Sequence, residues 1–319
     1  MKTGLTVETK NLTKRYGNFT AVNHLNLDIK AGESYGFLGP NGAGKTTTLM
    51  MLLGILKPTE GEVRISGELV SSDAFNTKGL IGFVPENQSF YEEMSAWEYL
   101  MFFAKLYQTE RPKERGQEIL EHLDLWAWRD VLISGYSNGM KRKLGFARAT
   151  IHSPDLLVLD EPIAGLDPLG IIQIRELLMA EQERGCTLLI SSHILSEVEK
   201  TVNRVGIISK GKMVWQDTME NLQQWVTEKQ HITITLSSVD NEIIAGFRSL
   251  PFVQEVISEG NSLCLVMDQA GDYREDISRF ILQKNLILLE MKEEKTTLEE
   301  AFVNITENNV QDLTGETER

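Results

Sequence analysis

One glycine-rich segment near the N-terminus limits the folds open to this chain more than any other feature. It reads Gly39-Pro40-Asn41-Gly42-Ala43-Gly44-Lys45-Thr46-Thr47, with the spacing G-x-x-x-x-G-K-T. Glycines at these positions allow a tight turn in which several backbone N–H groups point inward at one phosphate. Lys45 supplies a positive charge for the β- and γ-phosphates, and the hydroxyl of Thr46 is suited to bind Mg²⁺. The alternative is an ordinary glycine-rich turn.

The segments on either side of this loop supply the context that the motif requires. Residues 34–38 are typical of a strand, and residues 46–56 have the composition of an apolar helix. A strand–loop–helix order puts the phosphates at a helix N-terminus, where the helix dipole favours anions. The sequence therefore predicts a P-loop α/β fold that binds a nucleoside triphosphate.

A second apolar run, residues 156–159, ends in two acidic residues, Asp160 and Glu161. A continuous apolar stretch of this length indicates a strand buried on both faces of a parallel sheet. Such a strand delivers its terminal carboxylates to the ligand crevice at the edge of the sheet. We expect Asp160 to hold Mg²⁺, directly or through water, and Glu161 to polarise or orient the water that attacks the γ-phosphate. The alternative is a strand that ends in two solvated acids.

Charge and composition argue against several classes of protein. The 319 residues carry a net charge of −14, the opposite of the basic face expected of a nucleic-acid binder. The longest strongly apolar run, residues 49–56, is far shorter than the roughly 20 residues that span a bilayer, and the first residues show no secretory pattern. Cys186 and Cys264 form no metal or redox motif. We therefore expect a reducing cytosol, with both cysteines in the core.

A third segment, between the two apolar runs, reads Tyr136-Ser137-Asn138-Gly139-Met140-Lys141-Arg142. Ser137 is a good helix N-cap, and apolar residues then recur at helical spacing. With the two motifs around it, this segment resembles the signature sequence of the ATP-binding cassette (ABC) family. The family's other motifs are matched in order over residues 5–220, by Tyr16, by Ala164-Gly165-Leu166-Asp167 and by Ser191-Ser192-His193.

The resemblance implies a role for each matching residue. Residues 39–47 hold the triphosphate of ATP, with Lys45, Glu161 and His193 as the catalytic residues. His193 resembles the switch histidine that hydrogen-bonds the γ-phosphate and the attacking water. Tyr16 resembles the aromatic residue that stacks on adenine, with an aromatic packed in the core as the alternative. The remaining matches concern a second subunit: Ser137 and Gly139 contact its γ-phosphate, and Asp167 communicates across the dimer.

The chain departs from the family pattern in the loop after residues 81–84. The family places a glutamine there that contacts Mg²⁺ and the transporter interface, whereas this sequence has Glu86 at the expected position. A carboxylate also ligates Mg²⁺, so Glu86 joins Thr46 and Asp160 as an expected metal residue. Gln88 takes this role if the loop is shifted by two residues.

The resemblance also implies the architecture of the first part of the chain. Residues 1–215 form the ABC nucleotide-binding domain, a P-loop NTPase (RecA-like) core with antiparallel β and helical subdomains. The helical insert spans about 89–153, and exposed aromatic residues near Phe90 and Tyr91 are expected to form a groove for a helix of a membrane subunit. Because one chain carries both halves of a competent site, a twofold homodimer is favoured. Pairing with a related ATPase stays open.

The pattern changes after residue 215. We expect a linking helix over 216–230, an accessory α+β domain over 231–307 with a final helix over 297–306, and a disordered tail over 308–319. The order β-α-β-β-α-β indicates a split βαβ, ferredoxin-like domain. Its end resembles that of accessory domains on ATPases of ABC-2 type exporters, which serve drug, antibiotic and peptide efflux. We expect a packing or dimer-clamping role, with ligand sensing as the alternative.

The predicted function is that of an ATP-hydrolysing subunit that drives export through separate integral membrane permease subunits. We expect it at the cytoplasmic face of the cell membrane, with no nucleic acid as partner. The alternatives are a soluble ABC ATPase acting on ribosomes or DNA, an importer ATPase, and a non-hydrolysing ATP sensor, which Glu161 disfavours. The ribosomal type has two cassettes in one chain and the chromosomal type a long coiled coil, and neither pattern is present. The C-terminal pattern does not match the β-rich regulatory domains that importers often carry.

Overall fold

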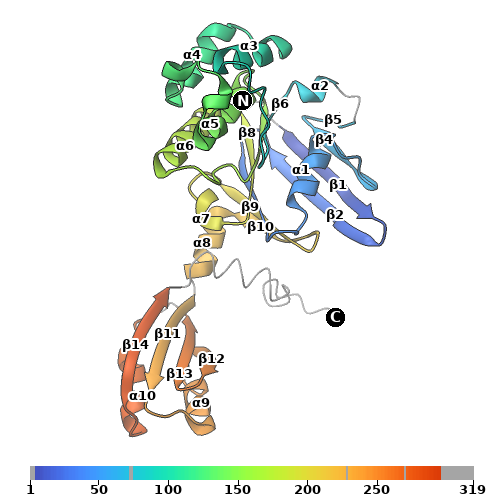
Figure 1. Ribbon diagram of the computed structural model, residues 1–319. Coiled ribbons are helices and arrows are strands. Elements are labelled where there is room, and N and C mark those ends of the chain that lie inside the picture. The colour runs from blue at the N-terminus through green and yellow to red at the C-terminus, as the bar shows by residue number, and fades with distance from the viewer. Residues whose placement is uncertain (1–3, 72–74, 228, 269–270, 296–319) are drawn as a thin grey trace. The chain divides into compact units, whose positions relative to one another are not determined.

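A computed structural model describes residues 4–71, 75–227, 229–268 and 271–295 of the chain (Figure 1). These residues divide into two compact units, one that reaches Met219 and one that begins at Glu220. The linking helix expected over 216–230 corresponds to α8, Met219–Thr227. The helix expected over 297–306 and the tail over 308–319 lie outside the described residues.

A six-stranded sheet forms the centre of the first unit, in the order β10-β9-β3-β8-β7-β6. Its strands are β3 (Ser34–Leu38), β6 (Ile81–Val84), β7 (Leu156–Asp160), β8 (Thr187–Ser192), β9 (Arg204–Ser209) and β10 (Lys212–Thr218). The β9–β10 pair is antiparallel and the other pairs are parallel. Every residue of β3, β7 and β8 is buried, because these strands are covered on both faces.

The carboxyl ends of four parallel strands meet at one edge of this sheet. There β3 leads into the glycine-rich loop at Gly39, and β7 ends at Asp160. At the same edge β8 leads to His193, and β6 leads to the loop that carries Glu86. Motifs that are far apart in the sequence are therefore brought together by strand direction alone.

A second, antiparallel sheet has the order β2-β1-β4-β5. Its strands are β1 (Leu5–Tyr16), β2 (Phe19–Lys30), β4 (Glu60–Ile65) and β5 (Glu68–Leu69). The β1–β2 hairpin turns at Gly17, whose φ of 56° is left-handed, and it pairs Tyr16 with Phe19. Helix α1 (Lys45–Leu52) joins the two sheets, since its Leu49 shares one core with Leu25 of β2 and Phe37 of β3.

Helices cover the sheets of the first unit. They are α1, α2 (Phe75–Lys78), α3 (Ala96–Leu106), α4 (Pro112–His122), α5 (Asn138–Thr150), α6 (Pro168–Glu183) and α7 (Leu195–Val198). The expected helical insert corresponds to α3, α4 and α5, which lie together in Figure 1. α1 ends before the predicted residue 56, because Gly54 adopts a left-handed φ of 66° just after it.

Gly82 of β6 allows α5 to approach the central sheet closely. A Cβ atom at Gly82 would lie 2.1 Å from the carbonyl oxygen of Ala149 on α5. The obstructing atom belongs to the backbone of α5, so no side-chain rotation relieves the clash. The absence of a Cβ at Gly82 therefore allows the helix to lie this close to the sheet.

The second unit has the predicted order β-α-β-β-α-β. Its elements are β11 (Lys229–Leu236), α9 (Asn241–Arg248), β12 (Val253–Glu259), β13 (Ser262–Asp268), α10 (Arg274–Gln283) and β14 (Leu288–Lys295). The strands form an antiparallel sheet in the order β12-β13-β11-β14, which is the ferredoxin-like topology. Phe247 of α9 and Ile281 of α10 share a core with Ile234 of β11, so both helices pack on the sheet.

The Gly82 contact predicts a specific loss of stability. Gly82→Ala should lower the free energy of unfolding by about 1–3 kcal/mol, because the added methyl group forces β6 and α5 apart. Gly135→Ala is the matched control, since a Cβ there has its nearest neighbour at 3.7 Å, and it should change stability by less than about 0.5 kcal/mol. Urea unfolding followed by circular dichroism measures both values. Equal stability of the two variants would contradict this account.

A second prediction concerns acid sensitivity. His152, just after α5, stacks on Tyr107 with ring centroids 4.0 Å apart, and burial lowers the pKa of His152 from 6.5 to about 4. Between these two pKa values His152 is protonated in the unfolded chain but not in the folded chain. The free energy of unfolding therefore falls as the pH drops from 6.5 to 4, by at most about 3 kcal/mol. His152→Phe keeps the stacking and removes the titration. Its stability should fall less over this range, and an unchanged pH profile would refute the assignment.

Candidate nucleotide-binding site

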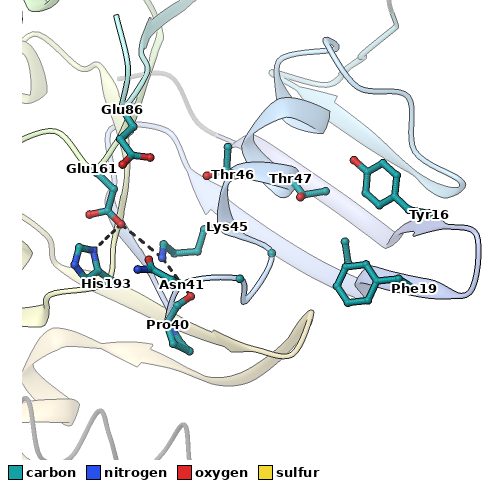
Figure 2. Close-up of a pocket in the computed structure, with 13 residues that line it drawn as sticks. Tyr16, Phe19, Pro40, Asn41, Lys45, Thr46, Thr47, Glu86, Glu161 and His193 are labelled. Atoms are coloured by element: carbon teal, nitrogen blue, oxygen red, sulfur yellow. Dashed lines mark hydrogen bonds and ion pairs between the residues drawn. The ribbon is translucent and has the colours of Figure 1, made fainter.

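A pocket of about 330 Å³ lies over the glycine-rich loop (Figure 2). It is lined by Tyr16, Phe19, Ala21, Pro40, Asn41, Gly42, Gly44, Lys45, Thr46, Thr47, Glu86, Glu161 and His193. Tyr16 and Phe19 lie at one end, while Glu86, Glu161 and His193 lie at the other, with the loop between them. An aromatic end and a charged end on opposite sides of a phosphate loop suit a nucleotide that lies along the loop.

The glycine-rich loop depends on two backbone positions that exclude other residues. Gly44 has a left-handed φ of 109°, and a Cβ there would lie 2.5 Å from the carbonyl oxygen of Ala21. At Gly39 a Cβ would lie 2.4 Å from the carbonyl oxygen of Ile208. Because α1 begins at Lys45, directly after Gly44, the N–H groups of its first turn face the loop.

Three titratable side chains converge at the charged end of the pocket. Nζ of Lys45 donates to the carbonyl oxygen of Gly39 at 2.7 Å and lies 3.6 Å from Oε1 of Glu161. Nδ1 of His193 lies 2.9 Å from the same oxygen. The side chains of Lys45 and Glu161 are 7% and 9% exposed, so their attraction is screened far less than on the surface.

Asp160 is placed to hold a cation. The hydroxyl of Thr46 donates to Oδ2 of Asp160 at 3.1 Å, and the hydroxyl of Ser191 donates to Oδ1. Asp160 is 2% exposed. A carboxylate and a hydroxyl are the hard oxygen donors that Mg²⁺ prefers, so the two residues fit the predicted metal.

The backbone of Glu161 is held in an uncommon conformation. Its φ of 48° lies in the left-handed region. Its N–H donates to the carbonyl oxygen of Ser191 at 3.1 Å, and its carbonyl oxygen accepts a hydrogen bond from the guanidinium of Arg142. Burial lowers the pKa of Arg142, and the nearby carboxylates of Glu86, Asp160 and Glu161 oppose this shift. The guanidinium remains a cation.

Glu86 and Gln88 occupy different surroundings. Glu86 lines the pocket, whereas the amide of Gln88 points at α5, where a Cβ at Gly145 would lie 1.5 Å from its Oε1. Both polar atoms of the Gln88 amide are buried without a hydrogen-bond partner among the described residues. Glu86 is therefore the residue of this loop that reaches the nucleotide pocket.

The signature residues lie outside the pocket of their own chain. Ser137 is the N-cap of α5, where its hydroxyl accepts from the N–H of Met140 at 3.2 Å, and Gly139 follows in the first turn. Asp167 caps α6 in the same way, accepting from the N–H of Gly170 at 2.9 Å. Ser137 and Asp167 are exposed, so both helix N-termini are open to an outside ligand or a second subunit.

Two residues of the site were missed by the sequence analysis. Phe19, 63% exposed, pairs with Tyr16 across the hairpin and lines the pocket, which alternating strand residues on either side of Gly17 could have indicated. Arg142 lies within the signature segment, but its contacts depend on how α5 packs on two strand ends.

Comparisons with known proteins agree with this geometry. A model of the ABC transporter family matches residues 22–164. The bacitracin transport ATP-binding protein BcrA of Bacillus licheniformis is 36% identical over 301 residues, covering 94% of this chain and 96% of the relative. The chain belongs to the ABC transporter family of ATP-binding proteins. As an ABC cassette, it is an ATP-binding and ATP-hydrolysing subunit.

Further relatives extend the comparison of this ABC protein. The linearmycin resistance ATP-binding protein LnrL of Bacillus subtilis is 32% identical over 312 residues, covering 96% of this chain and all of the relative. A solved structure of cbiO1 from Clostridium perfringens, part of the ABC transporter complex cbiONQ, has a TM-score of 0.61 and 26% identity and covers 77% of this chain and 96% of that one. The predicted family and the predicted fold of the ATPase cassette are confirmed. These names favour neither the ribosomal nor the chromosomal alternative.

Among the residues that the structure describes, no helix has both the length and the apolar character that crossing a bilayer requires.

The position of Glu86 predicts the effect of one substitution on ATP hydrolysis. Glu86→Gln should leave kcat unchanged or raise it, because the amide keeps an oxygen donor and removes a negative charge beside the triphosphate. Steady-state phosphate release measures this. Gln88→Glu is the control: it buries an unpaired carboxylate against α5 and should lower thermal stability instead. Complete loss of hydrolysis in Glu86→Gln would mean that the carboxylate itself is required.

Proposed function

We propose that this chain is the ATPase subunit of an ABC exporter that moves an antibiotic, drug or peptide out of the cell. The ATPase part of the proposal is carried by one observation, the convergence of Lys45, Glu161 and His193 at the charged end of the nucleotide pocket. The names of the relatives, bacitracin transport and linearmycin resistance, support export of this class of compound.

The nucleotide lies along the glycine-rich loop. Its base stacks on Tyr16, with Phe19 beside it, and its β- and γ-phosphates receive the loop N–H groups and the ammonium of Lys45. Tyr16 is 50% exposed, which supports base stacking over a role in the core. Binding of the triphosphate turns Lys45 from the carbonyl oxygen of Gly39 toward the phosphates.

Thr46 and Asp160 would hold Mg²⁺, with Glu86, which lines the same pocket as Thr46, as a third oxygen donor. When bound, the metal neutralises charge on the β- and γ-phosphate oxygens. The hydroxyl of Ser191 keeps one oxygen of Asp160 in place. This leaves the other oxygen, which accepts from Thr46, as the one that would hold the metal.

Glu161 orients the attacking water and accepts its proton. His193, whose Nδ1 contacts Glu161, lies at the same end of the pocket and hydrogen-bonds the γ-phosphate and this water. Lys45 offsets the negative charge that increases as the water attacks. Most of the acceleration of ATP hydrolysis comes from positioning and charge stabilisation, because the protein takes little covalent part in phosphoryl transfer.

The site is completed by a second subunit. Ser137 and Gly139 of one chain contact the γ-phosphate held by the other, and the N-terminus of α5 directs its positive end at that phosphate. Asp167 carries the state of one site to the other. Glu161, His193 and Ser137 all occur in this chain, so a homodimer encloses two competent sites; pairing with a related ATPase uses the same surfaces.

The helical insert offers a surface for the permease. Tyr91 and Phe102 are 59% and 46% exposed, and their rings meet edge to face at 6.1 Å. A nearby hollow of about 300 Å³ is lined by Phe83, Phe103 and Tyr107, among others. Aromatic residues of this kind anchor amphipathic helices in grooves. We place the subunit at the inner face of the cell membrane, bound to separate permease chains through this surface.

Glu161→Gln tests the mechanism and the dimer together. The amide orients water but accepts no proton, so kcat should fall by about 10²–10⁴, and ATP with Mg²⁺ should trap a stable dimer. Light scattering after size exclusion measures the mass, and phosphate release measures the rate. Glu183→Gln, an exposed position on α6, is the control and should behave as the parent protein. A variant that stays monomeric at saturating ATP would count against the dimer, and an undiminished rate would count against Glu161 as the base.

A further inference from the structure

The guanidinium of Arg142 lies where two parallel strands end. It donates to four backbone carbonyl oxygens, two from each strand end. Those of Pro85 and Glu86 follow β6, and those of Glu161 and Pro162 follow β7. The residue is 9% exposed, so four of the five N–H groups of a buried arginine are used on this junction.

We propose that Arg142 is a positioning residue for ATP hydrolysis, which clamps the backbone of Glu161 to the Glu86 loop and to the helix that starts at Ser137. The inference deepens the proposed function and rests on the catalytic role given there to Glu161.

The two strand ends need an outside donor at this point. β6 and β7 pair from Ile81–Leu156 to Val84–Leu159, and a proline follows each strand within two residues, at Pro85 and Pro162. Proline has no N–H, so neither chain extends the ladder through these positions. The guanidinium supplies the donors that the prolines lack, and it thereby joins two segments that would otherwise separate.

The clamp acts on Glu161, the residue whose position matters most for the proposed hydrolysis. Glu161 has a left-handed φ of 48°. Residues that have a Cβ adopt this backbone conformation at a cost in free energy, so it persists only where the surrounding structure enforces it. The carbonyl of Glu161 is held by Arg142 and its N–H by Ser191. Release of the carbonyl lets the backbone relax, which moves the carboxylate away from Lys45 and His193.

A planar guanidinium is needed for this contact. Nε faces Pro162 at 3.0 Å, while the two terminal nitrogens divide the remaining three carbonyls between them. A lysine ammonium is a single point at the end of a flexible chain and does not bridge two loops in this way. A positive charge without the planar guanidinium group is therefore a poor replacement for Arg142.

The position of Arg142 also connects the clamp to the signature segment. It lies in α5, five residues after the N-cap Ser137. A shift of the start of α5, of the kind that contact with a second nucleotide would produce, is passed through one rigid helix turn to Glu161 and Glu86.

Arg142→Ala tests the inference. We expect kcat for ATP hydrolysis to fall about 10–100-fold, the effect of misplacing a reacting group by about 1 Å, while the dissociation constant for a fluorescent ATP analogue changes less than about threefold. Guanidinium ion at low, non-denaturing concentration should restore part of the rate, because it fits the space left by the side chain.

Arg115→Ala is the matched control. Its side chain is 10% exposed and bonds Glu181, Glu118 and the carbonyl oxygen of Thr150, so it tests loss of a buried arginine away from the nucleotide. We expect it to lower the melting temperature without a guanidinium-dependent gain in rate. The inference is overturned if both variants lose stability and rate to the same extent. It is also overturned if guanidinium ion does not raise the rate of Arg142→Ala.

Arg142→Lys keeps the test decisive if the alanine variant does not fold. This variant retains the charge, and we expect its kcat to stay at least several-fold below that of the parent protein; an undiminished kcat overturns the inference. Glu161→Gln separates the two claims. An undiminished rate in that variant refutes Glu161 as the base, whereas a low, guanidinium-dependent rate in Arg142→Ala still identifies the clamp as required for hydrolysis.

Discussion

The parallel ladder of the central sheet is the constraint on which the rest of this structure depends. It sets the ends of β3, β6, β7 and β8 at one edge of the sheet. Lys45 and His193, from distant parts of the sequence, therefore lie 3.6 and 2.9 Å from the same carboxylate oxygen of Glu161. The attraction between Lys45 and Glu161 is effective because both are buried. Strand direction and burial therefore form the charged end of the nucleotide pocket, whereas the β1–β2 hairpin of the other sheet forms its aromatic end.

The helical insert is coupled to that edge through α5. Gly82 sets the distance of the helix from β6, and Arg142 ties the helix to the strand ends. The N-terminus of α5 is meanwhile exposed at Ser137. α5 thus carries the proposed contact to a partner's phosphate at its start, and about one turn later it carries Arg142, which supports the proposed catalytic residue Glu161.

Sequence reasoning reached the elements whose pattern is local. The glycine-rich loop, the buried strand before Asp160, the cap at Ser137 and the β-α-β-β-α-β order of the second unit all follow from spacing and burial. The choice between Glu86 and Gln88 did not, because it depends on which side of one loop faces α5. The role of Arg142 could not be predicted for the same reason. Its partners are backbone carbonyl oxygens, which every residue has, and only the packing of α5 determines which of them it contacts.

The left-handed backbone at Glu161 has a consequence for how such a protein evolves. An ordinary residue in that conformation gives up roughly 1–2 kcal/mol of folding free energy, whereas glycine or asparagine adopts it readily. Selection for heat resistance alone would therefore favour glycine or asparagine at 161, and under the proposed mechanism the resulting protein would be more stable but inactive. Glutamate at this position therefore represents a trade-off between stability and the proposed turnover.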